Sequence, residues 1–353
     1  MPNKTNKMFN PRAQGSSRIG AMFVALLTLL MQGCNGGSPN APAIHALEGA
    51  TMGTTYTVQY SGDSVAGLKP GIDSVLREVN QSLSTYIPTA RISQINQSPT
   101  GAPMDAHLRI NFLKSLEVHR ESGGAFDPTV GPLTELWGFG ASRVTTLPDS
   151  AVIDSVCRYV GMANFIHRGD SLLKAHPLAR LDMSALAKGY GVDQVAEYLL
   201  RRGVGNFIVE IGGEVRAQGE KGAGDPWTVG IEKPQSGAGR VVQVALPLVN
   251  RSMATSGNYR NFKQVGGRKI VHTLNPKTGY PEVNDLLSAS VIAPDCMTAD
   301  AWATAFMVMG FEAAKKKSGE LTDIEVVFLY LDQNNEIQEY YSAGAAGLAN
   351  DRR

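Results

Sequence analysis

The chain has 353 residues, with 33 Lys and Arg against 32 Asp and Glu, so its formal net charge is +1. That length is enough to bury a large core, in one large domain or in two lobes. Because no basic run exceeds Lys315–Lys317, the composition argues against a nucleic-acid-binding protein, which normally carries a basic patch. The three cysteines, without a CxxC or HExxH motif, also argue against a zinc site.

Residues 1–34 resemble a bacterial lipoprotein signal peptide. Basic residues without an acidic one precede the apolar stretch Ile19–Met31, which is too short to span a bilayer as a stable helix. Gly33 and Cys34 follow, and in such leaders the cysteine is lipidated and becomes the new N-terminus. We therefore expect a flexible linker at 35–46 and a lipid anchor at Cys34, on the periplasmic face of a bacterial membrane. The outer membrane is favoured because no Asp follows the cysteine.

Hydrophobic patterns predict strands and helices between residues 48 and 175. Period-two alternation indicates a strand, and apolar residues spaced by three and four indicate helices. Asp127 before Pro128 indicates a helix start with Asp127 as its cap. The expected elements are a strand at 48–60, helices at 71–86 and 106–122, the helix beginning at Asp127, a helix at 150–160 and a hairpin at 165–175.

The stretch 181–213 predicts a strand, a turn of small residues, a helix and a second strand. The apolar residues after Gly191 form one helical stripe, which ends in a cationic last turn before Gly203. Asp182 or Ser184 is expected to cap the start of this helix. The strand that follows, at 207–211, is closed by Gly212 and Gly213.

The turn at 183–191 is a candidate anion-binding site. Its small residues leave the backbone uncovered beside the carboxylate of Asp182 and the ammonium group of Lys188. Free N–H groups at a helix start attract anions, and phosphate above all. The same residues also suit a tight helix–sheet contact with a capping Asp, and spacing alone leaves the two alternatives open.

The C-terminal half predicts further strands and an apolar helix, so the fold class is α+β, or mixed α/β, rather than Rossmann. No GxGxxG motif follows a first strand. We expect the catalytic domain at 47–343 and a tail at 344–353. Cys157 and Cys296 lie in apolar helical contexts and are either paired or two buried thiols. The expected elements are strands at 227–232, 241–246, 251–255, 269–273, 287–293, 325–331 and 337–341 and a helix at 298–309.

Asp300 and Thr304 lie four residues apart on the expected helix at 298–309 and share one face. A carboxylate and a hydroxyl group on one face suit a hard cation such as Mg²⁺, which takes oxygen ligands. The alternative is an Asp that stabilises the helix dipole beside a Thr that bonds back to a carbonyl. His272, at a strand end beside a Pro/Gly turn, is either structural or a general base that borders a pocket.

Seven segments, taken together and in this order, closely resemble the FAD:protein FMN transferases, the ApbE family. The resemblance covers about residues 47–341. Asn275 departs from the aspartate common in the family's His-x-x-Asp-Pro pattern. The segments are 52–56, 124–133, 181–193, 211–214, 254–262, 272–279 and 299–304.

The resemblance implies a two-lobed periplasmic enzyme that splits the pyrophosphate of FAD, passes FMN to a Thr or Ser hydroxyl group of a target flavoprotein and releases AMP. It implies a Mg²⁺ site formed by the side chains of Asp300 and Thr304 with the backbone oxygen of Ala185. His272 would be the base for the attacking hydroxyl group. The implied FAD contacts are Met52, Tyr86, Ala125, Phe126, Asp127, Asp182, Lys188 and Leu274.

Two other functions fit the same residues. In the first, water takes the place of the target, and the protein is a FAD pyrophosphatase that yields FMN and AMP. In the second, the protein is a lipoprotein that binds FAD without catalysis. No stretch of the chain resembles the family's acceptor motif, so we expect the target to be another protein.

Overall fold

The computed structural model describes residues 42–140, 146–222, 224–232, 242–258, 262–265 and 268–350. From Pro42 onward the chain forms one compact unit. The expected signal peptide, Cys34 and most of the expected linker lie outside the described residues. Among the helices that are described, none is long and apolar enough to cross a membrane.

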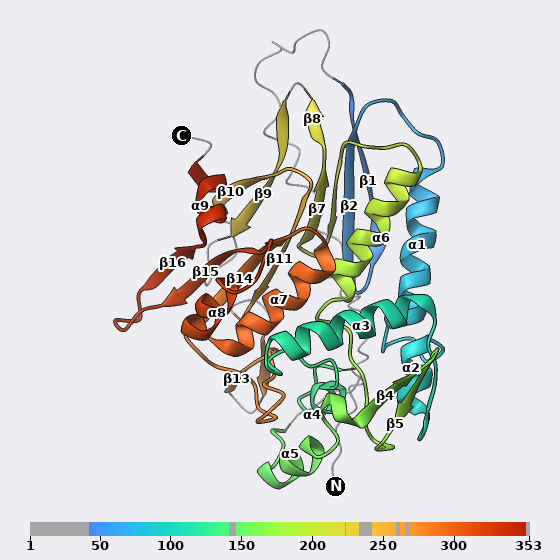
Figure 1. Ribbon diagram of the computed structural model, residues 1–353, viewed down its shortest axis with the longest axis vertical. Helices are drawn as coiled ribbons and strands as arrows, with labels where there is room; N and C mark the ends of the chain where they lie inside the picture. The colour runs from blue at the N-terminus through green and yellow to red at the C-terminus, as the bar shows by residue number, and fades with distance from the viewer. Residues whose placement is uncertain are drawn as a thin grey trace, which may run out of the picture. The chain divides into compact units, whose positions relative to one another are not determined.

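An eight-stranded sheet, whose neighbouring strands are all antiparallel, is the centre of the unit (Figure 1). Antiparallel pairing excludes a Rossmann fold and confirms the predicted mixture of helices and antiparallel sheets. In spatial order the strands are β1 (Ile44–Thr51), β2 (Thr54–Ser61), β6 (Phe207–Ile211), β7 (Glu214–Gln218), β11 (Arg251–Gly257), β14 (Leu286–Ala293), β15 (Glu325–Leu331) and β16 (Ile337–Tyr341).

Three small antiparallel sheets contain the other strands of the described residues. The hairpin predicted at 165–175 is present as β4 and β5, which are joined at Gly169. The small sheets are β3 (Gly101–Pro103) with β5 (Ser171–Lys174) and β4 (Phe165–Arg168), then β10 (Val242–Leu248) with β9 (Asp225–Glu232) and β8 (Glu220–Gly222), and β12 (Phe262–Val265) with β13 (Arg268–Val271).

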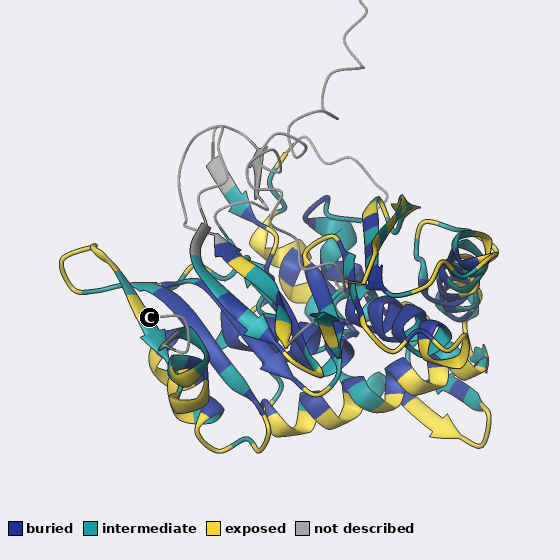
Figure 2. Ribbon diagram, turned by 90° about the horizontal axis from the view of Figure 1, so that it is seen from above, coloured by how far each residue is buried: buried dark blue, intermediate teal, exposed yellow. Residues whose placement is uncertain are grey.

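Helices cover the large sheet, with α6 against β6 and β7 and α7 against β11 and β14. Figure 2 shows that buried residues follow the strands and inner helices, whereas exposed residues gather on outer helices and loops. The helices are α1 (Leu68–Leu83), α2 (Arg91–Gln97), α3 (Ala106–Glu121), α4 (Gly131–Leu136), α5 (Ser150–Cys157), α6 (Ala187–Arg201), α7 (Cys296–Met309), α8 (Phe311–Ser318) and α9 (Ala343–Asn350), with a 3₁₀ turn at Met162–Asn164.

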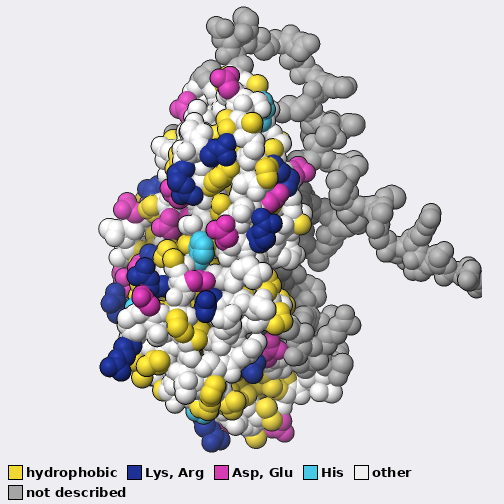
Figure 3. Space-filling model, turned by 90° about the vertical axis from the view of Figure 1, so that its right-hand side faces the viewer, with side chains coloured by type: hydrophobic (Ala, Val, Ile, Leu, Met, Phe, Trp, Pro, Cys, Tyr) yellow, Lys and Arg dark blue, Asp and Glu magenta, His cyan; other side chains and the backbone are white. Residues whose placement is uncertain are grey.

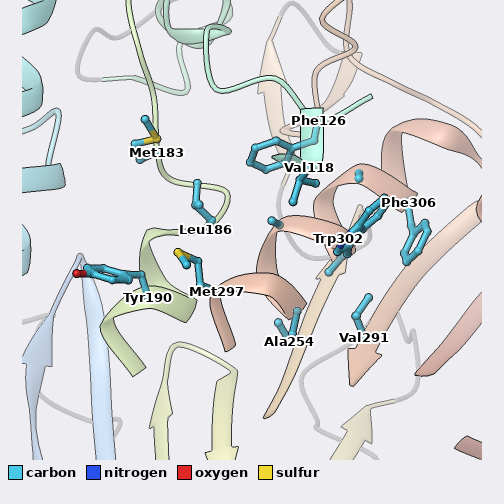
Figure 4. Close-up of a cluster of buried hydrophobic side chains, with 14 of the residues drawn as sticks. Val118, Phe126, Met183, Leu186, Tyr190, Ala254, Val291, Met297, Trp302 and Phe306 are labelled. Atoms are coloured by element: carbon cyan, nitrogen blue, oxygen red, sulfur yellow. The ribbon is translucent and has the colours of Figure 1, made fainter. Parts of the chain in front are cut away.

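Helix α7 is the centre of the main hydrophobic core. Figure 4 shows Trp302 and Phe306 of α7 in one cluster with Val118 of α3 and Tyr190 of α6. The sequence of α7 is mostly apolar on all sides, and a helix of this kind is buried on all sides. The charged exception inside the helix is Asp300, which is 3% exposed.

The strand predicted at 48–60 is in fact a hairpin of β1 and β2. The two residues at its turn, Met52 and Gly53, have φ of 50° and 74°. Two positive φ angles in a two-residue loop match the twist of the flanking strands, and across this loop the more buried positions change from odd numbers in β1 to even numbers in β2. Gly212 and Gly213 form the matching turn between β6 and β7, with φ of 63° and 108°.

Two predicted caps are wrong. Helix α6 begins at Ala187, and Asp182 does not cap it, because Asp182 Oδ1 accepts from the N–H of Ser184 instead. Ser184 does not cap it either: the N-cap residue is Leu186, without a side-chain hydrogen bond.

Asp127 is not the cap of α4. Its Oδ1 accepts from both the N–H and the hydroxyl group of Thr129, and α4 begins only at Gly131, with Pro132 in its first turn. An aspartate that bonds two residues ahead forms a turn of its own, which delays the helix.

Both ends of the expected catalytic domain differ in detail from the prediction. Strand β1 begins at Ile44, within the expected linker, and α9 begins at Ala343 and includes residues 344–350 of the expected tail. Ala345 of α9 is fully buried in a cluster with Trp227 and Leu248, so apolar packing extends the domain to this helix. Cys157 and Cys296 are both free thiols.

Candidate active site

A cavity of about 420 Å³ is lined by all twelve of the residues that the sequence singled out. The residues come from the β1–β2 turn, the loop after α1, the loops before α4 and α6, the segment after β13 and the helices α6 and α7. They are up to 252 positions apart in sequence, from Met52 to Thr304. They are Met52, Tyr86, Ala125, Phe126, Asp127, Asp182, Ala185, Lys188, His272, Leu274, Asp300 and Thr304.

A close crossing of α6 and α7 fixes one wall of this cavity. A Cβ atom on Gly189 would lie 2.3 Å from the carbonyl oxygen of Cys296, so only glycine fits at that point. The N–H of Gly189 donates to Asp300 Oδ2 at 3.0 Å. In a regular helix this N–H would donate to the carbonyl oxygen of Ala185. The Asp300 carboxylate therefore accepts the hydrogen bond that the Ala185 carbonyl oxygen would accept in a regular helix.

Asp193 of α6 fixes the start of α7 in the same region. Its two carboxylate oxygens accept from the N–H groups of Cys296 and Met297, at 3.0 and 2.9 Å, and Arg216 of β7 pairs with it at 3.1 Å. Burial raises the pKa of Asp193 to about 6, against the lowering effect of the two N–H groups and of Arg216. The positions of Gly189 and Asp300 thus follow from a hydrogen-bonded helix junction.

Asp300, Thr304 and Ala185 line the same cavity. Among the described residues, Asp300 Oδ1 accepts no hydrogen bond, and burial raises the pKa of this carboxyl group to about 7 against the lowering effect of Lys188. Thr304 Oγ1 lies 3.4 Å from the hydroxyl oxygen of Ser256. A carboxylate, a hydroxyl group and a carbonyl oxygen are all ligands of a hard cation.

The described residues contain no group of three or more His, Cys, Asp and Glu side chains that could hold a metal ion. The donor set here includes one carboxylate, so it does not resemble a site for a soft metal such as zinc. An unpaired oxygen of a buried carboxylate is nonetheless costly, and a cation at this position would satisfy it. The residues therefore fit Mg²⁺ bound with water and phosphate oxygens as its remaining ligands.

Lys188 lies in the cavity as an ion-paired ammonium group. Its Nζ forms a short hydrogen bond to Glu214 Oε1. Burial lowers the pKa of Lys188, but the negative charges of Asp300 and Glu214 outweigh burial and raise it, so the group stays protonated. Glu214 is not among the predicted site residues, although it belongs to the segment 211–214 that carries part of the resemblance.

His272 follows β13 directly and faces the cavity. Its side chain is exposed to that opening, with the ring of Phe139 edge-on at 5.9 Å. The surrounding atoms remove part of its hydration and lower its pKa. The positive charge of Lys188 lowers it further, while Asp182 opposes the shift. The imidazole is therefore neutral near pH 7, the state in which it accepts a proton.

Other residues shape the opening. The ring of Tyr86 is 65% exposed, and its hydroxyl group donates to the carbonyl oxygen of Phe139 at 3.2 Å. Met52 holds a left-handed φ at the β1–β2 turn, where its side chain packs beside Gly191. An aromatic ring and a thioether on an open rim offer apolar surface to a planar ligand.

Two carboxylates on the same rim are held by hydroxyl groups. Thr134 Oγ1 donates to Asp182 Oδ2 at 3.2 Å, and Thr129 Oγ1 donates to Asp127 Oδ1 at 2.6 Å. Burial raises the pKa of Asp127, against the lowering effect of the Thr129 hydrogen bonds and of His119. Both carboxylates are therefore held in fixed orientations.

Comparisons with known proteins show to which family the chain is similar. The model of the ApbE family matches residues 52–328. The FAD:protein FMN transferase of Vibrio cholerae is 37% identical over 330 residues, which cover 91% of this chain and 96% of that protein. The FAD:protein FMN transferase of Haemophilus influenzae is 35% identical over 311 residues, which cover 84% of this chain and 90% of that protein.

Solved structures give the same result. The flavin transferase ApbE from Vibrio cholerae superposes with a TM-score of 0.80 at 34% identity, covering 87% of this chain and 99% of that one. The flavinyl transferase ApbE from Pseudomonas stutzeri, in its apo form, superposes with a TM-score of 0.78 at 32% identity, covering 87% and 97%. Both similarities extend over nearly the whole described unit.

Proposed function

The chain belongs to the ApbE family, and on this premise we propose that it is an FAD:protein FMN transferase. It splits the pyrophosphate of FAD, transfers FMN to a Thr or Ser hydroxyl group of a target flavoprotein and releases AMP. The observation that carries the proposal is the convergence of Asp300, Thr304, Ala185, Lys188 and His272 on one cavity.

The reaction exchanges one phosphorus–oxygen bond for another. The hydroxyl oxygen of the target attacks the phosphorus atom on the FMN side of the pyrophosphate, and the bond to the bridging oxygen breaks. The bridging oxygen leaves with AMP, and the hydroxyl proton goes to a base. Such displacements are accelerated chiefly by positioning and by stabilisation of charge.

The proposal assigns Mg²⁺ to the oxygen atoms of Asp300, Thr304 and Ala185. A bound Mg²⁺ would stabilise negative charge on the phosphate oxygens and on the leaving group. Support comes from the hydrogen bond between Gly189 and Asp300, which orients this carboxylate and leaves its second oxygen and the Ala185 carbonyl oxygen free. Lys188 adds a permanent positive charge on the same wall.

The proposal assigns proton removal to His272. Its lowered pKa keeps Nδ1 or Nε2 ready to accept the hydroxyl proton, and the open side of the ring gives a target segment access. A positioned base of this kind contributes about 10²–10⁴-fold to a rate. Met52, Tyr86, Ala125, Phe126, Asp127, Asp182 and Leu274 would hold the dinucleotide on the remaining surface.

Incubation of the purified protein with FAD and Mg²⁺, with and without a threonine-bearing target protein, tests the proposal. A fluorescent target band on a denaturing gel, with AMP released in equal amount, is the expected result. Free FMN and AMP without a labelled target would instead indicate a FAD pyrophosphatase. Unchanged FAD in both reactions would indicate a protein that only binds FAD.

We also propose that the protein is lipid-anchored at Cys34 on the periplasmic face of a bacterial membrane, the outer membrane being favoured. The basic leader, the short apolar stretch and Gly33 before Cys34 support this. In a bacterial host, labelled palmitate should be incorporated into the wild-type protein and not into Cys34→Ser. Equal incorporation into both, or none into either, would contradict the anchor.

A further inference from the structure

Glu214 is a buried carboxylate in the cavity wall to which the proposed reaction assigns no step. The residue is 4% exposed, and its Oε1 accepts a hydrogen bond from Lys188 Nζ. Its Oε2 has no hydrogen-bond partner among the described residues. Leaving a buried carboxylate oxygen unpaired costs free energy, so the position of Glu214 needs an explanation beyond stability.

The fold holds Glu214 in place from two directions. It is the first residue of β7, directly after the tight turn at Gly212 and Gly213, and it is paired in register with Ile211. Two residues further along the same strand face, Arg216 forms ion pairs with two carboxylates of α6. Because β7 is fixed to α6 in this way, Glu214 is the stationary member of its pair with Lys188.

Lys188 is the member that can move, because its side chain is long and is 31% exposed to the cavity. Two carboxylates act on it: the charge of Asp300 raises its pKa most, and Glu214 raises it through both its charge and its hydrogen bond. Among the described residues, however, its only ion pair within 4.0 Å is with Glu214. An ammonium group released by Glu214 would find its nearest counter-charge on Asp300.

On the premise of the proposed function, we propose that Glu214 is a positioning residue for Lys188. It holds the Lys188 ammonium group off the Asp300 carboxylate, so that a divalent cation finds this carboxylate unpaired. Glu214 itself contacts neither the cation nor FAD. Two carboxylates and one ammonium group also leave a net charge of −1 on this wall, which favours a cation.

Calorimetric titration of the purified protein with Mg²⁺ tests this inference without an activity assay. In Glu214→Gln, Lys188 competes for Asp300, and we expect Mg²⁺ to bind about 10–100-fold more weakly, the usual effect of losing a partner of a metal ligand. A crystal structure of metal-free Glu214→Gln should show Lys188 Nζ hydrogen-bonded to Asp300. The matched control is Glu117→Gln, which removes the carboxylate of a Lys–Glu ion pair with Lys114 outside the cavity and should bind Mg²⁺ like the wild type.

Two results would overturn the inference. The first is unchanged Mg²⁺ affinity in Glu214→Gln. The second is weaker binding with Lys188 still away from Asp300 in the crystal structure, since the loss of charge alone would then explain the effect. A wild-type protein that binds no Mg²⁺ would instead contradict the metal assignment of the proposed function, and this inference with it.

A double variant keeps the inference testable if Glu214→Gln does not fold. Lys188→Met combined with Glu214→Gln removes both charges of the ion pair, so no unpaired charge is left buried in the cavity wall. Because no ammonium group remains to occupy Asp300, we expect Mg²⁺ to bind at least as tightly as to the wild type. Weaker binding by a folded double variant would contradict the positioning role.

Discussion

The cavity has two walls of different construction. The helix wall consists of Ala185, Lys188, Asp300 and Thr304, from α7, α6 and the loop before α6, and its key carboxylate is buried. The loop wall consists of His272–Leu274 with Tyr86 and Phe139, and its His and Tyr side chains are exposed to the opening. The helix wall is thus fixed before any ligand arrives, whereas the loop wall is accessible.

The loop wall owes its order to turn hydrogen bonds together with a small apolar cluster that includes Leu274 and Trp137. Asn275 Oδ1 accepts from the N–H groups of Lys277 and Thr278, and its Nδ2 donates to Glu282 Oε2 at 2.7 Å. An aspartate at this position would lack the donor for Glu282. The asparagine that departs from the family pattern therefore serves the turn that presents His272. The comparison shows that helix packing positions the charged groups Asp300 and Lys188, whereas a hydrogen-bonded loop positions the proposed base His272.

Figure 3 shows acidic and basic side chains interspersed over one face of the molecule, without a large field of a single sign. This fits the near-zero net charge of the chain. The strong electrostatic effects in this protein thus arise inside the cavity, where burial strengthens them, rather than from its surface charge.

The largest effect is expected on the helix wall, from Asp300→Ala. Loss of the carboxylate should lower FMN transfer by about 10³-fold or more, because a metal ion supplies several kcal/mol of charge stabilisation. The measurement is the initial rate of fluorescent labelling of a target, with circular dichroism as the check of folding. Asp300→Asn, which keeps an oxygen for the Gly189 N–H, should be equally slow. Labelling at the wild-type rate would make the metal assignment wrong.

On the loop wall, His272→Gln should lower the rate of transfer by about 10²–10⁴-fold, the usual contribution of a general base. Binding of Mg²⁺ should not change, because His272 lies on the other wall. The matched control is His167→Gln, since this exposed histidine of β4 lies outside the cavity. If His272→Gln transferred FMN at a rate within a factor of about two of wild type, His272 would not be the general base.

Gly189→Ala tests whether the helix wall depends on the crossing of α6 and α7. The new Cβ atom would meet the Cys296 carbonyl oxygen, so the helices must separate. We expect a loss of stability of about 1–3 kcal/mol and a fall in transfer of about 10²-fold. Gly205→Ala, whose Cβ atom would meet nothing within 4 Å, should leave the thermal midpoint and the rate unchanged. Equal midpoints for both variants would contradict the packing argument.

The smallest effect links the two walls through charge. Because burial and the charge of Lys188 lower the pKa of His272, the neutral base persists to a lower pH than for an ordinary histidine. With saturating Mg²⁺, so that Asp300 stays ionised, the rate of transfer should therefore fall as the pH drops through that lowered pKa. In Lys188→Met, the acidic limb of the pH–rate profile should move to higher pH. A limb that stays in place or moves down would show that Lys188 does not act on His272.

The sequence predicts the elements well where one physical signal dominates. The hairpin at 165–175 and the helix containing Asp300 are present within two residues of their predicted bounds. The prediction for α6 missed its first turn because Gly189 and Gly191 are poor helix formers. Close packing against α7 outweighs this propensity, and such packing cannot be inferred from the residues of one segment.

The site itself could not be derived from spacing. Gly189 and Asp300 are 111 positions apart and yet share a hydrogen bond. Only the resemblance of seven ordered segments to one family brought such residues together in advance. Glu214 was missed because its partner, Lys188, lies 26 positions earlier on a different element. A single glutamate at the start of a strand looks the same in the sequence whether its side chain is buried or exposed to solvent.

Two of the tryptophans stand directly behind the two walls. Trp302 lies on α7, two residues from Asp300, and Trp137 donates its indole N–H to the carbonyl oxygen of Gly279 behind the loop that carries His272. Both indoles are buried, so their emission responds to changes in packing rather than to solvent contact. The molecule therefore carries one intrinsic fluorophore for each side of its cavity, and single-tryptophan variants can follow the two sides separately in time.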